Sequence, residues 1–375
     1  MTTYHQMIST VTTDGLEMKL VEREMPTPKD HEIVVQVEAT PINPSDHGVM
    51  FGWADISQAS STGDGTDRVL RAPLAPGGLA RMKARLDQDL PVGNEGAGIV
   101  VDAGSDDYAQ SLMGKRVAVM GGGMYAGYRA VPAMNALLLP ETANSRDGAS
   151  CFVNPLTALC FVETMKGEGH KAIVHTAAAS NLGQMLNRIC QADGVEIVNI
   201  VRREAQADIL KEMGASHILN SSDDDFHLQL TDAIDATGAT LAFDAIGGSD
   251  MASKILLAME AAAARTPSAY SIYGSVHHKQ VYLYGSLDFG PTTLNRAYGM
   301  AWGVGGWLLP NFLAKAGMET AVRLRKRVAD ELHTTFKSHY TDEISLSDAV
   351  DADIVRRYNA KKTGEKFLIN PQLDV

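Results

Sequence analysis

Cysteine is scarce in this sequence. Among 375 residues there are three cysteines, Cys151, Cys160 and Cys190, and no two of them form a CxxC pair. Three cysteines cannot close a disulfide framework. We interpret them as small buried hydrophobic residues of a protein in a reducing compartment.

Long apolar runs are also missing. The most apolar window, 297–309, is rich in glycine and stops at Pro310, whereas a membrane span needs about 20 such residues. The first twenty residues alternate between polar and apolar, which is not the pattern of a signal peptide. We therefore expect a buried or interface segment at 297–309 and a cytoplasmic location.

Positive charge is in deficit. The chain has 33 Lys and Arg against 45 Asp and Glu, a formal net charge of −12. An acidic surface repels phosphate backbones and anionic lipids, so nucleic acid and membranes are poor candidates for partners. A local basic site can still bind a phosphorylated cofactor.

Apolar residues, by contrast, are plentiful. They make up 45% of the chain, and its length suits about two domains of ~100–200 residues each. β-Branched residues and near-alternation in the first third predict strands at 17–22, 32–39, 97–102, 116–120 and 128–131. Between Phe51 and Leu90 the signals are mixed, and we predict a loop with one short helix at 80–87. Long loops in compact domains often cover sites.

From about Ala149 the pattern changes to alternating strands and helices. The predicted strands are 172–176, 195–201, 216–219, 240–245, 269–273 and 281–285. The predicted helices are 155–165, 182–193, 204–213, 227–236 and 249–264. This alternation predicts an α/β fold with a doubly wound parallel sheet. From about Pro291 we predict helices at 293–316 and 319–334, and then a strand at 365–369 that returns to the first domain's sheet.

The stretch 172–203 is the most informative. An apolar strand leads directly into the small residues of 177–183 and then into a helix. Small residues let the backbone approach a pyrophosphate at a helix N-terminus. Ser180 and Asn181 stand where glycines are expected, so the turn alone also fits a tight strand-to-helix turn in any α/β protein.

Two arginines follow the next predicted strand. That strand ends in Arg202 and Arg203, and the first carboxylate is Glu204. Sites for NAD place an acidic residue there, whereas sites for NADP place arginine near the 2′-phosphate. NADPH is therefore the expected cofactor, although the pair could also be solvated charges that open a helix. A second glycine cluster, GGGMYAGY at 121–128, precedes a strand rather than a helix, so we assign it to a turn.

Several segments resemble the medium-chain dehydrogenase/reductase superfamily, closest in pattern to its zinc-free quinone oxidoreductases. They are 171–220, INPSD at 42–46, VGNEGAGIVVDAGS at 92–105, GKRVAV at 114–119, NPLTAL at 154–159, FDAIGG at 243–248 and GEKFLIN at 364–370. The resemblance implies a GroES-like catalytic domain (1–152 and 291–375), a Rossmann domain (153–290) and an active site in the cleft between them. The stretch between Phe51 and Leu90 is longer than in typical quinone oxidoreductases.

The resemblance also bears on metal. Zinc-dependent members have ligands at three positions that hold Asn43, Asn94 and Val153 here, and amides or valine cannot replace thiolate and imidazole. The family's four-cysteine zinc lobe is missing too. We expect no metal, and without a Lewis acid the remaining chemistry is hydride transfer from NADPH to a quinone or an α,β-unsaturated carbonyl.

The resemblance implies roles for individual residues. Asn43 and Thr157 would lie near the nicotinamide, as would Ala245, Gly247, Tyr284 and Gly285, whereas Ala179, Ser180, Asn181, Leu182 and Gly183 would meet the pyrophosphate. Structural alternatives exist: Asn43 could brace a turn before Pro44, Thr157 could cap or pack a helix, and Tyr284 could be a plain sheet residue.

The proton donor is less defined. Quinone oxidoreductases often have a tyrosine where this chain has Gly48. His47 and Tyr125 are candidates, although both could be structural, and a hydroquinonate can also take its proton from water. The alternatives to a quinone or enone reductase are an enoyl-thioester reductase and a non-catalytic NADPH-binding protein that senses redox state or plays a structural part. By similarity we expect a homodimer, formed by pairing the strand near 281–284.

Overall fold

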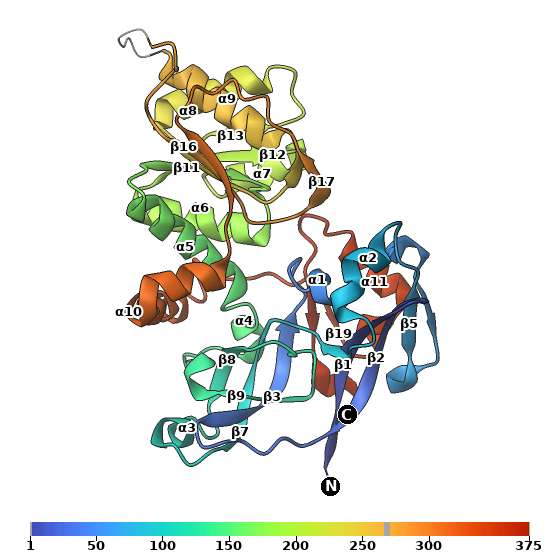
Figure 1. The fold of residues 1–375 in the computed structure, drawn as a ribbon. Helices are drawn as coiled ribbons and strands as arrows, with labels where there is room; N and C mark the ends of the chain where they lie inside the picture. Colours follow the sequence, from blue (N-terminus) through green and yellow to red (C-terminus); the bar gives the residue numbers. More distant parts are fainter. Residues whose placement is uncertain (1, 266–270, 375) are drawn as a thin grey trace. The chain divides into compact units, whose positions relative to one another are not determined.

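The chain folds into two compact units. The computed structural model describes residues 2–265 and 271–374. The first unit contains 1–153 and 325–375, and the second contains 154–324 (Figure 1). Among the described residues, no helix combines the length and hydropathy of a membrane-spanning segment.

The first unit is built on β-sheets. Its strands are β1 (Thr3–Thr12), β2 (Gly15–Glu24), β3 (Glu32–Pro41), β4 (Ser60–Thr62), β5 (Val69–Ala72), β6 (Leu90–Pro91), β7 (Glu95–Ala103), β8 (Arg116–Met120), β9 (Tyr128–Pro132), β10 (Ala136–Leu138), β19 (Asp342–Ile344) and β20 (Phe367–Ile369). Its short helices are α1 (His47–Met50), α2 (Gly78–Met82), α3 (Asp107–Ser111), α4 (Ser145–Gly148) and α11 (Ala352–Asn359).

The strands of the first unit form two sheets. One has the order β4-β5-β2-β1-β6, and the other has the order β10-β8-β7-β3-β20-β19, with β9 also paired to β3. In β2 the alternate residues Leu16, Met18 and Leu20 are buried, which is the period expected of a strand with one face on the core. The C-terminal strand β20 pairs antiparallel with β3, so the predicted return of the C-terminal strand to a sheet of the first domain is confirmed.

The stretch between Phe51 and Leu90 is not the loop that was predicted. It contributes β4 and β5 to the first sheet, and β5 pairs antiparallel with β2. The predicted helix at 80–87 is α2, which begins at Gly78, ends at Met82 and continues as a 3-10 turn at Lys83–Arg85. These strands have three and four residues, too short for an alternation to stand out among polar neighbours.

The second unit is a parallel sheet covered by helices. Its strands are β11 (Ala172–Thr176), β12 (Glu196–Val201), β13 (Ile218–Asn220), β14 (Leu241–Asp244), β15 (Gly247–Ser249), β16 (Lys279–Leu283), β17 (Asp288–Thr292) and β18 (Trp302–Gly306). Its helices are α5 (Val153–Gly167), α6 (Asn181–Asp193), α7 (Glu204–Glu212), α8 (Phe226–Thr237), α9 (Met251–Ala263) and α10 (Leu309–Asp330), of which α5 and α10 extend across the unit boundaries.

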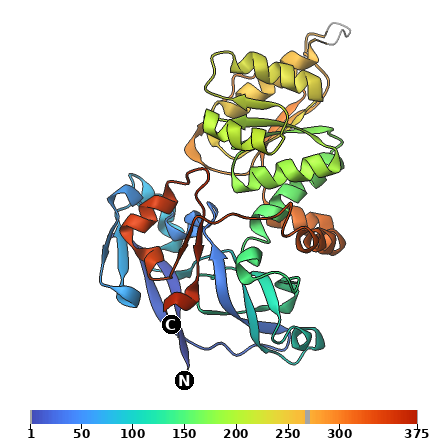
Figure 2. The ribbon, with the colours of Figure 1, turned by 180° about the vertical axis from the view of Figure 1, so that it is seen from behind.

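The order of the main sheet is β13-β12-β11-β14-β16-β18, and every pair is parallel. Helices α8 and α9 lie on one face and α5 and α6 on the other (Figures 1 and 2). The chain enters at β11 and its direction of growth reverses between β11 and β14, which is the arrangement of a doubly wound dinucleotide-binding fold. The predicted fold class, with its Rossmann domain, is therefore confirmed.

An aromatic layer fills the α5 side of this sheet. Phe161 of α5 stacks on Phe243 of β14, with ring centroids 3.8 Å apart, and meets Tyr284 and Trp307 edge-on at 4.8 Å. On the other side, apolar residues of α8 and α9 cover Val174, Ala242 and Val281. Both faces of the strands are therefore buried, which explains their continuous apolar runs.

Two predicted elements near the end of this unit differ from the structure. The helix predicted at 293–316 is wrong before Leu309, because 302–306 forms β18, which extends the sheet beside β16. The second unit consequently continues past Pro291. The predicted strand 269–273 lies partly outside the described residues, and 271–273 is not a strand. The predicted break between the two helices is confirmed, because α10 is interrupted at Gly317, whose backbone is not helical (φ 84°, ψ 170°).

The strand near 281–284 cannot pair with a second copy in the predicted way. It is β16, and its two sides are occupied by β14 and β18. Strand β18, rather than β16, forms the edge of the sheet on this side.

Candidate functional site

The turn from β11 to α6 has the geometry of a tight strand-to-helix connection. Ala177 adopts φ 51°, a left-handed conformation that small residues tolerate best. Ser180 caps α6, since its hydroxyl accepts the backbone N–H of Gly183 at 3.2 Å. A Cβ on Gly183 would lie 2.1 Å from the carbonyl oxygen of Ala178. The first turn of α6 therefore packs directly against the turn that leaves β11, which only glycine at 183 permits.

This geometry explains why the glycine fingerprint is incomplete. Ser180 has the extended backbone of an N-cap residue (φ −65°, ψ 165°), and Asn181 is the first residue of the helix. Neither conformation requires glycine. The structure brings together all five residues predicted to meet a pyrophosphate, namely Ala179, Ser180, Asn181, Leu182 and Gly183.

Arg202 and Arg203 lie just beyond the carboxyl end of β12, next to this turn in the sheet order. Both are exposed. Within the described residues, neither guanidinium group has a hydrogen-bond or ion-pair partner. The backbone of Arg202 is held instead, by the side chains of Gln206 and Ser222. The nearest carboxylate in sequence, Glu204, pairs with Lys211, so two cationic side chains stand uncompensated at this edge.

The carboxyl ends of β14 and β16 approach each other closely. A Cβ on Gly285 would lie 2.5 Å from the carbonyl oxygen of Ala245, and one on Gly247 would lie 2.7 Å from that of Gly285. The backbones of the predicted residues Ala245, Gly247, Tyr284 and Gly285 therefore pack closely together at this edge. The Tyr284 hydroxyl is 2.8 Å from Nε2 of His175, and burial raises the pKa of Tyr284 and lowers that of His175 to about 3.

A buried carboxylate organises the same edge. Asp244 ends β14 and accepts hydrogen bonds from the Thr176 hydroxyl at 2.7 Å and from the backbone N–H of Ile246 at 2.9 Å and of Gly247 at 3.3 Å. The Thr176 hydroxyl in turn accepts the N–H of Ala245 at 2.8 Å. These bonds connect the ends of β11 and β14, the point at which ligands bind in doubly wound sheets.

In the first unit, Asn43 lies in a buried polar cluster. Its Nδ2 donates to Oε1 of Glu95 at 2.7 Å, and its Oδ1 accepts from Nζ of Lys366 at 3.3 Å. The other oxygen of Glu95 accepts the backbone N–H groups of Phe152 at 2.8 Å and Val153 at 3.0 Å. The side chain of Asn43 is thus anchored at both ends of its amide.

Asp46 completes this cluster. One of its oxygens accepts the N–H of Asn43 at 2.7 Å and the other that of Asn94 at 2.9 Å. Burial raises its pKa to about 7, and the neighbouring Glu95 carboxylate adds to the rise. Burial also raises the pKa of Glu95, against the pull of Lys366.

The two proton-donor candidates of the first unit are both buried, and Tyr125 lies beside the carboxylate of Asp46. His47 is buried in α1 against Phe51 and Tyr358, and burial lowers its pKa to about 3. It is therefore neutral at pH 7. Tyr125 is fully buried and its hydroxyl donates to the carbonyl oxygen of Pro41 at 3.1 Å, and burial raises its pKa well above the usual value.

Thr157 and the three positions that correspond to zinc ligands lie in different surroundings. Thr157 is buried in the first half of α5, which belongs mostly to the second unit. At the positions of the family's zinc ligands, Asn43 is buried in its cluster, Asn94 donates from Nδ2 to the Ser45 hydroxyl at 3.1 Å, and Val153 begins α5. Among the described residues, no group of three or more His, Cys, Asp or Glu side chains could hold a metal ion.

Sequence reasoning named Asn43 but missed its partners Glu95, Asp46 and Lys366, and it missed Asp244. Each of the four lies in a motif quoted for the resemblance. A signal was available for two of them: Glu95 is the first residue of a largely buried strand, and Lys366 directly precedes another. A charge at such a place is rarely buried unless it is paired.

The comparison with known proteins agrees with this geometry. The profile of the zinc-binding dehydrogenase family matches residues 181–267, within the second unit. The synaptic vesicle membrane protein VAT-1 homolog of Rattus norvegicus is 31% identical over 170 residues, 44% of this chain and 41% of that protein. The alignment with this relative therefore spans less than half of its length.

Solved structures match the whole chain. A Mesorhizobium loti protein that is named as an NADPH:quinone reductase has a TM-score of 0.73 at 24% identity, over 99% of both chains. Quinone oxidoreductase of Escherichia coli, solved with NADPH, has a TM-score of 0.69 at 19% identity, over 99% of this chain and 100% of that one.

Part of the second unit, 181–267, thus matches the zinc-binding dehydrogenase family, and the whole chain resembles the solved quinone oxidoreductases in fold. At these identities the solved structures establish its fold, which is that of the quinone oxidoreductases.

Proposed function

We propose that this chain is a member of the medium-chain dehydrogenase/reductase superfamily and an NADPH-dependent oxidoreductase that reduces a quinone or an α,β-unsaturated carbonyl without a metal. The observation that carries the proposal is the exposed, uncompensated pair Arg202 and Arg203 at the carboxyl end of β12. A guanidinium group binds phosphate through two parallel hydrogen bonds. A 2′-phosphate is the group by which NADPH differs from NADH.

The residues present fit such a cofactor. The turn from β11 to α6 has small residues at Ala177 and Ala178, and Gly183 holds the helix close to the strand. The backbone N–H groups that begin α6 give this turn a positive end for a pyrophosphate. The glycines at 247 and 285 keep the edge of β14 and β16 free of side chains.

NADPH, when bound, supplies a hydride to the acceptor, and the reduced acceptor then takes a proton, on oxygen for a hydroquinonate and on the α-carbon for the enolate of an enone. The chain's own contribution is orientation and exclusion of water. We assign the orientation of the acceptor to Asn43, whose amide is anchored by Glu95 and Lys366. His47 is neutral and Tyr125 is engaged with Pro41, so in this proposal the proton comes from water.

The test of the activity is a panel of acceptors. Purified protein is mixed with NADPH and a quinone, a small enone or an enoyl thioester, and the near-ultraviolet absorbance of NADPH is followed. Oxidation with a quinone or small enone supports the proposal, and preference for the enoyl thioester would favour the alternative of an enoyl-thioester reductase. Tight binding of NADPH without oxidation by any acceptor would favour a non-catalytic binding protein.

The cofactor assignment is tested by the double variant Arg202→Ala/Arg203→Ala. Loss of charge-assisted hydrogen bonds to the 2′-phosphate is expected to weaken NADPH binding about 10–100-fold. Binding of NADH should change by less than about twofold, because NADH has no group for the pair. Fluorescence titration measures both. Lys171→Ala is the control, since it removes an exposed positive charge directly before β11, at the opposite edge of the sheet. Equal losses for both cofactors would contradict the assignment.

A further inference from the structure

Lys366 is a cation placed among buried groups of the first unit. It lies directly before β20 and forms part of the same hydrogen-bonded cluster as Asn43. Glu95 and Asp46 are the charged groups that face it, and its Nζ is 5.6 Å from the ring centroid of Tyr340. Long cationic side chains are seldom buried without such partners.

The contacts of Lys366 determine which way the Asn43 amide points. An ammonium group has only donors, so it must face the amide oxygen, and the carboxylate of Glu95 has only acceptors, so it must face the amide nitrogen. The observed pairs, Nζ to Oδ1 and Nδ2 to Oε1, satisfy both requirements. Removing the lysine would leave Oδ1 without this donor and the amide with one anchor fewer.

We infer that Lys366 is a positioning residue of the reductase: its ammonium group holds the Asn43 amide in one orientation, and this orientation is the one that binds the acceptor. This inference rests on the proposed function, in which Asn43 orients the acceptor. Lys366 acts through Asn43 and takes no part in bond formation. It also supplies the one positive charge that faces the carboxylates of Glu95 and Asp46 within the described part of the chain.

A pH dependence follows from this arrangement. Burial lowers the pKa of Lys366 to about 8, although Glu95 and Asp46 oppose the fall. Lys366 is therefore cationic at pH 7 and becomes neutral as the pH rises through about 8. A neutral amine holds an amide oxygen less strongly than an ammonium group does. Catalytic efficiency is expected to decline over the same range.

The kinetic test compares Lys366→Met with Lys366→Arg. Lys366→Met removes the charge at similar length and is expected to lower kcat/KM at pH 7 about 10–100-fold, with the binding of NADPH unchanged. Its pH profile should stay flat between pH 7 and 9, whereas the wild-type value should fall toward that of the variant. Lys366→Arg keeps the charge and should retain most of the activity. Its kcat/KM should not decline between pH 7 and 9. Lys362→Met, an exposed lysine of the same turn, is the matched control and should behave as wild type.

A second readout does not depend on activity. In protein labelled with 15N-asparagine, the side-chain amide signals of Asn43 are identified by their absence in Asn43→Ser. In the wild type these signals should show a step with a midpoint near pH 8, besides the step near pH 7 that Asp46 causes, and in Lys366→Met the step near pH 8 should be absent. A wild type that oxidises no NADPH but shows this titration would refute the proposed reductase activity and still support the positioning of Asn43 by Lys366. Signals without the step near pH 8, or kcat/KM of Lys366→Met within twofold of wild type, would overturn the inference.

Discussion

At the scale of single residues, the carboxylate of Asp46 makes stability depend on pH. Its pKa in the folded chain is about 7, against about 3.9 in an unfolded one. Between these values the folded state binds more protons than the unfolded state. The free energy of unfolding is therefore expected to fall as the pH rises from about 4 to 7, by at most about 1.4 kcal/mol per pH unit from this group.

The variant Asp46→Asn tests this expectation. It removes the titration but also one acceptor, for the N–H of either Asn43 or Asn94, so it should be less stable at every pH. Its stability between pH 4 and 7 should nevertheless fall less steeply than that of the wild type. Urea unfolding at several pH values measures both slopes. Asp14→Asn, in an exposed turn, is the control and should keep the wild-type slope; an unchanged slope in Asp46→Asn would contradict the prediction.

Sequence reasoning reached some residues of the candidate site and not others for a physical reason. The turn at 177–183 and the arginines at 202 and 203 are local in sequence, so their pattern is visible before any folding. The cluster around Asn43 joins a loop after β3, the start of β7 and the residue before β20. Such a cluster exists only after distant strands have paired, and its hydrogen bonds leave no spacing in the sequence.

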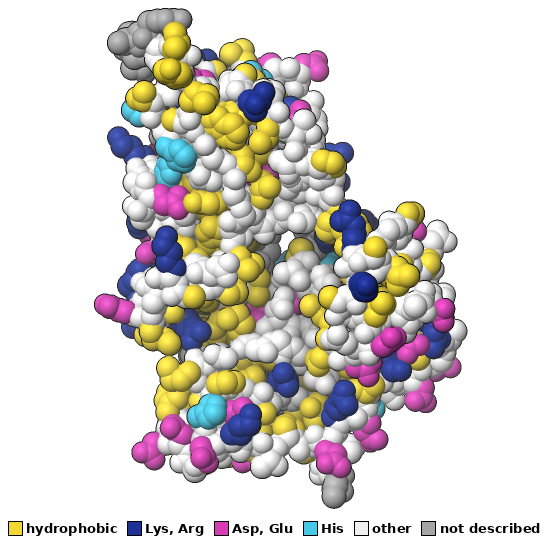
Figure 3. All heavy atoms as spheres, in the orientation of Figure 1, with side chains coloured by type: hydrophobic (Ala, Val, Ile, Leu, Met, Phe, Trp, Pro, Cys, Tyr) yellow, Lys and Arg dark blue, Asp and Glu magenta, His cyan; other side chains and the backbone are white. Residues whose placement is uncertain are grey.

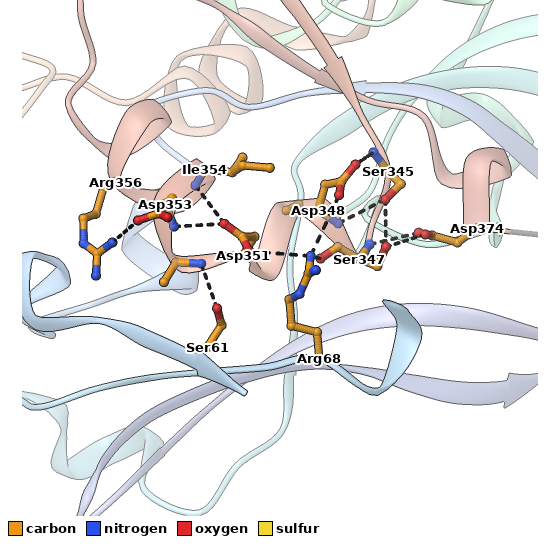
Figure 4. Close-up of polar contacts among 12 residues, drawn as sticks. Ser61, Arg68, Ser345, Ser347, Asp348, Asp351, Asp353, Ile354, Arg356 and Asp374 are labelled. Carbon is orange, nitrogen blue, oxygen red and sulfur yellow. Dashed lines mark hydrogen bonds and ion pairs between the residues drawn. The ribbon is translucent and has the colours of Figure 1, made fainter. Parts of the chain in front are cut away.

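At the scale of elements, the C-terminal segment is fastened to the stretch between Phe51 and Leu90. Arg68, before β5, donates to the carbonyl oxygen of Ser347 at 3.0 Å and lies 3.8 Å from carboxylate oxygens of Asp348 and Asp351 (Figure 4). Asp351 also caps α11. Further contacts join Ser61 to the N–H of Ala352, Arg356 to the carbonyl of Ala59, and Ser347 to Asp374.

This arrangement predicts a local effect of Arg68→Ala. The variant is expected to lower the free energy of unfolding by about 1–2 kcal/mol, because it removes a hydrogen bond to a carbonyl and two partly screened ion pairs. Amide hydrogen exchange should quicken at 345–356. The control Arg71→Ala removes an exposed ion pair between β5 and Glu17 of β2. It should lower the free energy of unfolding by less than about 0.5 kcal/mol. Equal effects of the two variants would show that the fastening by Arg68 adds nothing to α11.

Elements were predictable where apolar strands alternate with amphipathic helices over a long stretch. The strands and helices from β11 to α9, apart from the three-residue β15, lie within a few residues of their predicted positions. Strand β18 reads WGVGG, with three glycines and no alternation, so its apolar neighbours suggested a helix. Its pairing with β16 decided the outcome, since tertiary context overrides weak local propensity.

At the scale of the whole molecule, net charge and local charge act in opposite directions on a phosphorylated cofactor. The chain carries −12 overall, and Figure 3 shows basic and acidic side chains interspersed over the visible face. This diffuse negative charge acts over distances comparable to the Debye length of about 10 Å at 0.1 M salt. A contact pair of unit charges at a protein surface interacts more strongly, by about 4 kcal/mol before desolvation. The pair Arg202 and Arg203 should therefore dominate in the wild type.

Salt should consequently change cofactor preference with opposite signs in two proteins. In the wild type, raising KCl from about 20 mM to about 300 mM should lower the preference for NADPH over NADH about threefold or more, because the exposed guanidinium pair is screened. In Arg202→Ala/Arg203→Ala only the diffuse repulsion remains, and screening it should favour NADPH slightly. Fluorescence titrations of both cofactors at each salt concentration measure the two ratios. The same salt response in both proteins would mean that some other group selects the cofactor, because the direction of the response depends on which charge lies nearest to the 2′-phosphate.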